Sequence, residues 1–154
     1  MSLSARIRTL ILSTFAALLL ATSLSAADPA AGPASGPQAP TGLRCEYLEN
    51  PIGIDVRQPR FFWVLEHSER GQSQSAYQVL VSADPAVAVG EVWDSGKVAS
   101  AKSTQVVFGG RALESGRAYF WKIKYWDKDG RESPWSGAAR FETGLFDRAE
   151  WKGV

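Results

Sequence analysis

Cysteine is the residue that this sequence most nearly lacks, because Cys45 is the only one among 154 residues. A single cysteine excludes a disulfide within the chain and any metal site built from cysteines. Cys45 lies in an alternating apolar segment, so we expect a buried and unreactive thiol. Histidine is equally scarce. His67 has no second histidine or cysteine to complete a metal site and no Gly-x-Ser-x-Gly motif to serve, so we expect it in a solvated loop.

The sequence also lacks an excess of charge of one sign and a long apolar run. The chain has 17 basic and 16 acidic residues, which does not suggest a polyanion such as nucleic acid as a partner. Its main apolar run, residues 10–20, is shorter than the ~20 residues that span a bilayer. Arg6 and Arg8 precede this run and small residues follow it, which is typical of a secretory signal peptide over residues 1–27. We therefore expect an exported protein, periplasmic or secreted, without a membrane anchor after cleavage.

Three further regions follow the expected signal peptide. Residues 28–39 are rich in proline, alanine and glycine, which predicts a flexible linker because such a segment buries little apolar surface. Residues 40–144 carry the periodic pattern of a folded domain. Residues 145–154 are expected to form a tail that leads into a further domain.

The clearest pattern in the folded region is the alternation of large side chains after Tyr119. Tyr119, Trp121, Ile123 and Tyr125 occupy every second position, which predicts a strand with one buried face. Leu113 and Gly116 precede it in the arrangement of a tyrosine corner, in which the tyrosine hydroxyl bonds back to the preceding turn. The following residues 127–130 predict a hairpin turn.

Six further segments have strand character and are separated by turn residues. With the stretch from Tyr119, the predicted strands cover residues 43–48, 60–65, 76–82, 92–98, 104–108, 119–126 and 135–143. Seven short strands over roughly 105 residues are typical of an all-β, antiparallel immunoglobulin-like or fibronectin type III sandwich. The side chains predicted to be buried include Trp63, Tyr77, Tyr119 and Trp121.

The opposite alternation predicts an outward-facing apolar set. Phe120 and Trp126 should face out on one strand and Leu80 on its neighbour, with Phe62 and Val64 outward on the other sheet. Four residues are candidates for a contact surface with another domain or for a sugar-stacking platform: Leu80, Phe120, Trp126 and, in the tail, Trp151. The remaining alternative is that Trp126 is simply folded over a loop or shielded by lysine stems.

Carboxylates and metal ligands give no comparable signal. An inverting glycosidase needs two carboxylates across a cleft, and the candidates are Asp94, Asp127, Asp129, Glu66 and Glu69. Asp127 and Asp129 stand in a turn, where aspartate is common for local hydrogen bonding. A calcium loop there would need further ligands at fixed positions, and the chain lacks them. We therefore predict no catalytic, cofactor-binding or metal-binding residue.

Several phrases, in this order, carry a family resemblance. They are LRCEYLENPIGID from Leu43, PRFFW from Pro59, RGQSQSAYQVLV from Arg70, WDSGKV from Trp93, YFWKIKYWDKDG from Tyr119, SPWS from Ser133 and FETGL from Phe141. The series resembles the N-terminal fibronectin-type module of bacterial α-L-rhamnosidases of glycoside hydrolase family 78. The resemblance covers about residues 40–154.

The resemblance implies a larger enzyme. Such enzymes continue with further β-sandwich domains and an (α/α)₆ barrel, whose carboxylates hydrolyse terminal α-L-rhamnose with inversion. We therefore expect a non-catalytic accessory module of an exported rhamnosidase, truncated before its catalytic domain, with the downstream domains as its partners. The alternative is a stand-alone exported sandwich that binds a glycan or a protein.

Overall fold

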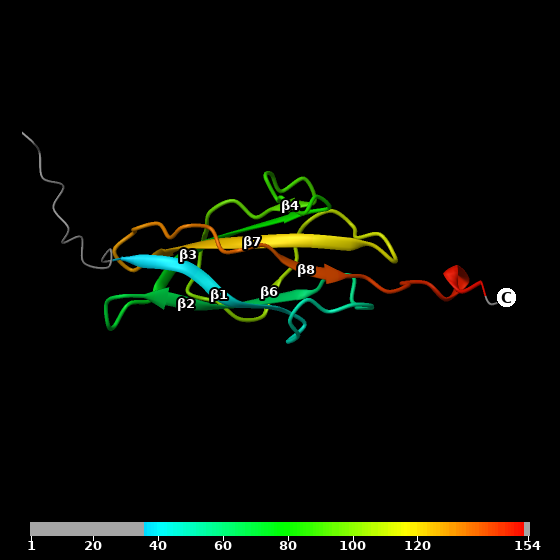
Figure 1. Ribbon diagram of the computed structural model, residues 1–154, viewed down its shortest axis with the longest axis horizontal. Helices are drawn as coiled ribbons and strands as arrows, with labels where there is room; N and C mark the ends of the chain where they lie inside the picture. The colour runs from blue at the N-terminus through cyan, green and yellow to red at the C-terminus, as the bar shows by residue number, and fades with distance from the viewer. Residues whose placement is uncertain (1–35, 153–154) are drawn as a thin grey trace, which may run out of the picture. The chain divides into compact units, whose positions relative to one another are not determined.

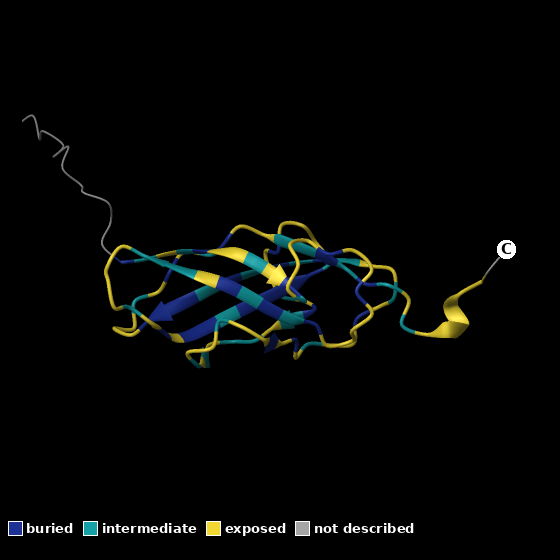
Figure 2. Cartoon of the chain, turned by 90° about the horizontal axis from the view of Figure 1, so that it is seen from below, coloured by how far each residue is buried: buried dark blue, intermediate teal, exposed yellow. Residues whose placement is uncertain are grey.

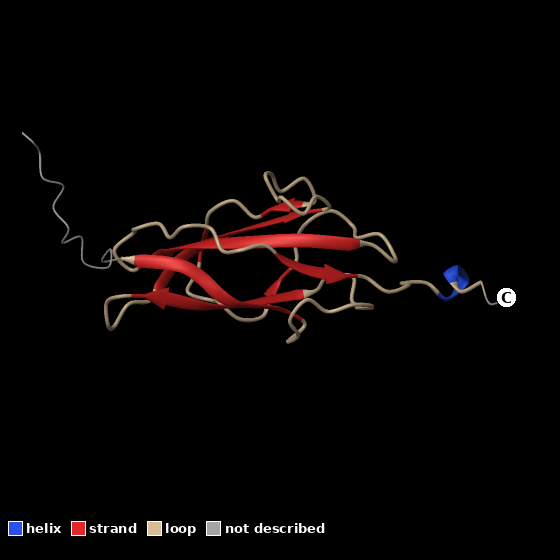
Figure 3. Ribbon diagram, in the orientation of Figure 1, coloured by secondary structure: helices blue, strands red, loops and turns tan. Residues whose placement is uncertain are grey.

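The computed structural model describes residues 36–152, so the expected signal peptide and most of the expected linker lie outside the described residues. The described part forms eight strands and one short 3₁₀ helix (Figures 1 and 3). They are β1 (Pro37–Cys45), β2 (Arg60–His67), β3 (Gln74–Ser82), β4 (Trp93–Asp94), β5 (Val98–Ala99), β6 (Val106–Val107), β7 (Ala118–Asp127), β8 (Ala139–Glu142) and η1 (Arg148–Glu150).

The strands form two sheets that face each other across a shared core. One sheet has the order β1-β2-β6, and the other has the order β4-β3-β7-β8 with β5 also pairing with β3. All of these pairings are antiparallel, which confirms the predicted all-β sandwich. One predicted edge strand, residues 92–98, is divided into β4 and β5. The division falls at Ser95 and Gly96, where Gly96 has a φ of 59° that turns the chain away from the ladder.

Aromatic rings from both sheets fill the core. The Phe61 ring lies 4.5 Å from the Trp121 ring and 5.8 Å from the Phe141 ring, measured between centroids. Trp63 meets Tyr77 edge-on at 5.3 Å, a favourable geometry for two rings. The four side chains predicted to be buried are buried: Trp63, Tyr77, Tyr119 and Trp121. Figure 2 shows buried residues alternating with intermediate ones along the strands, while most exposed residues are in the loops.

The predicted tyrosine corner is present before β7. The backbone N–H of Glu114 donates a hydrogen bond of 2.9 Å to the Tyr119 hydroxyl oxygen. Leu113 is buried beside it. Gly116 has a φ of 63° in the turn and donates its N–H to the carbonyl of Gly144. This backbone angle is costly for residues with a Cβ atom, which explains the glycine.

The first strand starts and ends earlier than predicted. β1 begins at Pro37, which pairs with His67, so residues 37–39 belong to the sandwich and not to the linker. The strand ends at Cys45 because Glu46 and Tyr47 have φ values of 48° and 68° and form a two-residue reversal. Backbone hydrogen bonds in both directions between Cys45 and Leu48 close this turn.

The last strand is shorter than the predicted 135–143, because β8 starts only at Ala139. Along residues 133–138 two serine hydroxyls take the place of backbone carbonyls. Ser133 Oγ accepts from the N–H of Tyr125, and Ser136 Oγ accepts from the N–H of Ile123, each at 3.0 Å. The segment therefore follows the edge of β7 without being a regular strand.

Candidate domain-contact surface

Trp126 is not the exposed aromatic residue that the alternation suggests. It lies outside the main core cluster, yet only 7% of it is exposed. The Lys97 ammonium lies 4.2 Å and the Lys124 ammonium 5.0 Å from the centre of its ring. Lysine stems therefore shield the indole, which is one of the alternatives left open by the sequence, and cation–π attraction favours this cover.

Lysines also cover the neighbouring Trp135, and Lys124 is shared between the two rings. Lys124 lies 4.8 Å and Lys122 5.1 Å from the centre of that ring. Lys124 is held in addition by an ion pair of 2.6 Å with Glu132. Sugar stacking needs an accessible ring face, and these two indoles have charged groups over them. This arrangement does not favour a sugar platform on the outer side of β7.

Leu80 is buried as well, although the alternation places it outward. Its exposed fraction is 6%, and it also lies outside the main core cluster. The chain passes directly over it at Gly90, where an added Cβ atom would come within 2.9 Å of Leu80 Cδ2. Of the predicted outward set on this sheet, Phe120 remains partly exposed. A contact role for Leu80, Phe120 and Trp126 stays a prediction, but the expected continuous exposed patch is absent from the described part of the sheet.

His67 ends β2 and is not in a solvated loop, so the expectation for this residue was wrong. Only 7% of its side chain is exposed, and its Nε2 atom lies 3.2 Å from Asp127 Oδ2. The N–H of Glu69 donates to His67 Nδ1 at 2.9 Å. Because Nδ1 accepts this bond, Nε2 carries the hydrogen and donates it to the carboxylate. In this form the ring accepts the hydrogen bond from the Glu69 N–H and donates one to the Asp127 carboxylate.

Asp127 is the centre of a buried network of polar contacts. It accepts hydrogen bonds from the N–H groups of Asp129 and Arg131 and from the Arg131 guanidinium. Burial by itself would raise its pKa, but these bonds and that from His67 outweigh burial and leave the pKa below its usual value. Arg131 also pairs with Glu69 and, with help from Gln72, holds the Glu69 pKa at about 2. The predicted turn at residues 127–130 is confirmed.

The remaining candidate carboxylates also have local partners. Glu66 accepts a hydrogen bond from the Thr41 hydroxyl, and Asp94 accepts from the Gln78 amide and from the N–H of Gly96. Within residues 36–152, no three His, Cys, Asp or Glu side chains come together in a way that could hold a metal ion. The contacts give these carboxylates structural roles in turns and strands.

Cys45 is buried in the core, as predicted. Burial raises the pKa of its thiol to about 12, and the nearby Glu46 carboxylate adds to this effect. Because the thiolate is the reactive form of cysteine, this environment keeps the group unreactive near neutral pH.

The end of the sandwich from which the chain leaves carries exposed apolar residues. Trp151 is 74% exposed, so its predicted position on the surface is confirmed, while its contact role stays a prediction. The segment before it is not a free tail. Phe146 packs against the core, and the Arg57 guanidinium lies 4.8 Å from the centre of its ring. Arg57 also pairs with the Asp147 carboxylate at 3.1 Å.

No helix in the described range has the length and apolar character needed to cross a bilayer.

Comparison with known proteins assigns the domain. Residues 40–147 match the family model described as "Rha78A-like, N-terminal immunoglobulin domain". An α-L-rhamnosidase of Streptomyces avermitilis is 41% identical over 107 residues, which are 69% of this chain and 10% of the relative. An α-L-rhamnosidase of Formosa agariphila is 42% identical over 107 residues, 66% of this chain and 11% of the relative. The chain thus spans about a tenth of the length of these relatives.

A solved structure agrees with this match. The α-L-rhamnosidase from Dictyoglumus thermophilum superimposes with a TM-score of 0.72 at 42% identity, over 74% of this chain and 13% of that chain. The similarity therefore extends to the fold of the whole sandwich.

Proposed function

The chain belongs to the family of Rha78A-like N-terminal immunoglobulin domains, and on this basis we propose that it is a non-catalytic domain-packing module of an exported α-L-rhamnosidase. The parent enzyme would hydrolyse terminal α-L-rhamnose from glycosides with inversion, as the resemblance implies. The catalytic domain of such an enzyme is not contained in these residues, because the match is confined to the N-terminal immunoglobulin domain. The partners would be the downstream domains of the parent enzyme.

The observation that carries the proposal is the extent of the match. About two thirds of this chain corresponds to only a tenth of each relative, and the corresponding part is the sandwich. The geometry supports a non-catalytic role, since Asp127 is buried and bonded and Glu69 and Asp129 are paired with Arg131. General acid and base catalysis needs carboxylates placed across an open cleft. These carboxylates instead hold turns in place.

The alternative from the sequence is a stand-alone sandwich that binds a glycan or a protein, and glycan binding finds less support. The indoles of Trp126 and Trp135 are covered by lysine ammonium groups. A glycan that stacked on them would have to displace these groups together with the Lys124–Glu132 ion pair.

The proposal is tested by incubating the purified chain with an aryl α-L-rhamnoside, with the Streptomyces avermitilis enzyme as the positive control. We expect no turnover by the chain and turnover by the control. A non-catalytic role would be contradicted by turnover that persists through purification. That turnover would also have to disappear when Glu66 or Asp94 is replaced by its amide. Titration with L-rhamnose by calorimetry checks the alternative, and saturable heat would favour a glycan-binding module.

The export of the protein is tested separately. Amino-terminal sequencing of the protein recovered from a bacterial periplasm or medium is expected to start at Asp28, which follows the small residues of the predicted cleavage site. A start at Met1 in the cytoplasm would contradict it.

A further inference from the structure

Three exposed apolar side chains lie where the chain leaves the sandwich. Ile52 and Trp151 are 73% and 74% exposed, and Leu145 is 44% exposed. We call these three residues the exit face. Large apolar side chains gathered on a surface often mark a contact with another protein surface.

The exit face is one surface, although its residues come from two segments. Gly53 and Gly144 approach so closely that an added Cβ atom on Gly144 would lie 3.1 Å from the Gly53 carbonyl oxygen. The N–H of Gly144 donates to the Ile54 carbonyl at 2.7 Å, and the N–H of Ile54 donates to the Glu142 carbonyl at 2.9 Å. Ile52 precedes and Leu145 follows this contact. Leu145 and Trp151 in turn line the same hollow.

Side-chain bonds fix the exit segment to the domain almost to its end. Arg57 holds Asp147 through two hydrogen bonds of 3.1 Å. Ser115 accepts from the N–H of Phe146 and donates to the Glu150 carboxylate at 2.6 Å. The chain is therefore attached to the sandwich as far as Glu150. A domain that follows it in the same polypeptide would begin beside the exit face and not at the end of a free linker.

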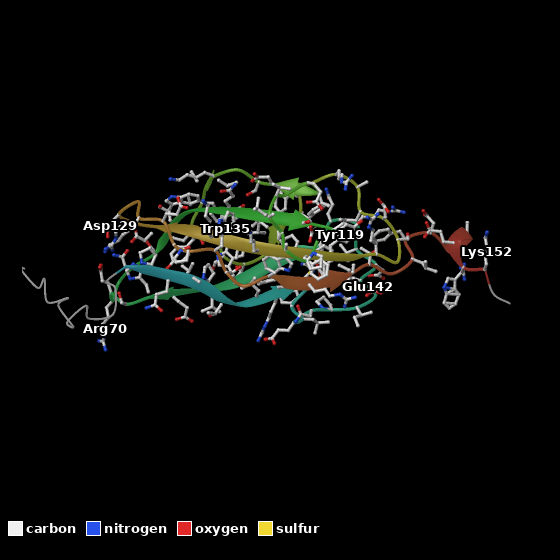
Figure 4. The ribbon with its side chains drawn as sticks, turned by 45° about the horizontal axis from the view of Figure 1, so that its top comes forward. Arg70, Tyr119, Asp129, Trp135, Glu142 and Lys152 are labelled. Atoms are coloured by element: carbon white, nitrogen blue, oxygen red, sulfur yellow. The ribbon has the colours of Figure 1, made fainter. Side chains whose placement is uncertain are left out.

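We propose that the exit face packs against the domain that directly follows this one in an α-L-rhamnosidase polypeptide. The inference rests on the proposed function and names the surface that it uses. The partner surface would be apolar, with polar groups at its margin that face the Arg57–Asp147 ion pair. The opposite end of the sandwich is less suited, because it carries two charged turns, one with Arg70 and one with Asp129, far from Lys152 (Figure 4).

The inference is tested in a chimera in which residues 36–152 replace the matching segment of the Streptomyces avermitilis enzyme. One variant combines Ile52→Ser with Leu145→Ser, and a second carries Trp151→Ser. The control combines Val64→Ser with Val89→Ser, since these valines are 53% and 65% exposed and lie outside the exit face. Each variant is also made in the isolated chain, where the exit face is already in water and the changes should have little effect.

We expect the exit-face variants to lower the melting temperature of the chimera by about 2–4 °C and to leave that of the isolated chain unchanged. The valine control should leave both unchanged. Hydrogen exchange provides a measurement without substitutions: amides at 52–56 and 145–151 should exchange more slowly in the chimera than in the isolated chain.

The inference would be overturned, but not the proposed function, by two results in an active, folded chimera. The exit-face variants would melt as the control does, and the amides at 52–56 and 145–151 would exchange as in the isolated chain. Turnover by the isolated chain would instead overturn the proposed function. If the chimera does not fold, the isolated chain is titrated into the Streptomyces enzyme lacking its matching residues. Binding that the exit-face variants weaken about tenfold supports the inference, since that is the scale of losing one buried apolar contact, and absence of binding overturns it.

Discussion

At the scale of the residue, the hydroxyl of Tyr119 and the indole of Trp63 contribute to stability in different ways. Tyr119→Phe removes the acceptor for the Glu114 N–H, and we expect a loss of about 1 kcal/mol in the free energy of unfolding. Trp63→Ala empties a core position that contacts Tyr77 and should cost about 3–5 kcal/mol. Urea titration of both variants checks this. Equal and negligible losses would contradict the core assignment.

Residue-level prediction succeeded where a side chain's position follows from the strand period. Tyr119 and Trp121 point inward because alternate residues of a strand face the same side. The period gives only the side of the sheet, so it did not show that Leu80 is covered or which of the alternatives for Trp126 holds. The expectation of a solvated loop for His67 was wrong. Gly90 of the loop that follows β3 covers Leu80, lysines cover Trp126, and Asp127 from another strand holds His67. Whether a side chain is covered depends on tertiary contacts, which the alternation within one strand does not predict.

At the scale of the element, the edge of the larger sheet depends on serine hydroxyls where the chain runs beside β7 before β8 begins. Ile123 is fully buried, so its N–H needs the acceptor that Ser136 provides. We expect Ser136→Ala to cost about 1–3 kcal/mol, the penalty for leaving a buried donor without a partner. Urea titration measures the loss, and faster amide exchange at Ile123 should accompany it.

The matched control is Ser73→Ala, because Ser73 is exposed in the loop before β3. This variant should unfold as the parent does. If Ser136→Ala were as stable as the control, another group would have to satisfy the Ile123 amide, and the assigned role of the hydroxyl would be wrong.

The elements and the candidate surface differ in how far the sequence predicts them. β2, β3 and β7 have long alternating patterns and were found close to their predicted bounds. Of the exit face, only Trp151 was singled out beforehand. Ile52 stands between turn residues and Leu145 follows a glycine, so neither belongs to a periodic pattern. Isolated large apolar residues in a turn-rich segment were the available signal, and their meaning emerges only when Gly53 and Gly144 come together.

At the scale of the whole molecule, buried charge connects parts of the chain that are far apart in sequence. The network around Asp127 joins the end of β2 to the hairpin after β7 through His67 and Arg131. In the folded protein the pKa of Asp127 is below its ordinary value of 3.8. The unfolded chain therefore binds a proton more readily than the folded chain does. The resulting stabilisation is present above about pH 4 and is lost as the pH falls through the lower, folded pKa.

This linkage predicts how Asp127→Asn changes acid unfolding. At neutral pH the variant should lose about 1.5–3 kcal/mol, because hydrogen bonds to a charged and buried carboxylate are lost. Below about pH 4 the gap to the parent should narrow, since the parent loses the same stabilisation on protonation. Some acid sensitivity should remain, because Arg131 lowers the pKa of Glu69 and Arg60 lowers that of Glu46. Urea titrations between pH 2 and 7 measure both effects, with the exposed Asp55→Asn as the matched control. Parallel pH profiles for the parent and the Asp127 variant would show that this network does not couple protonation to folding.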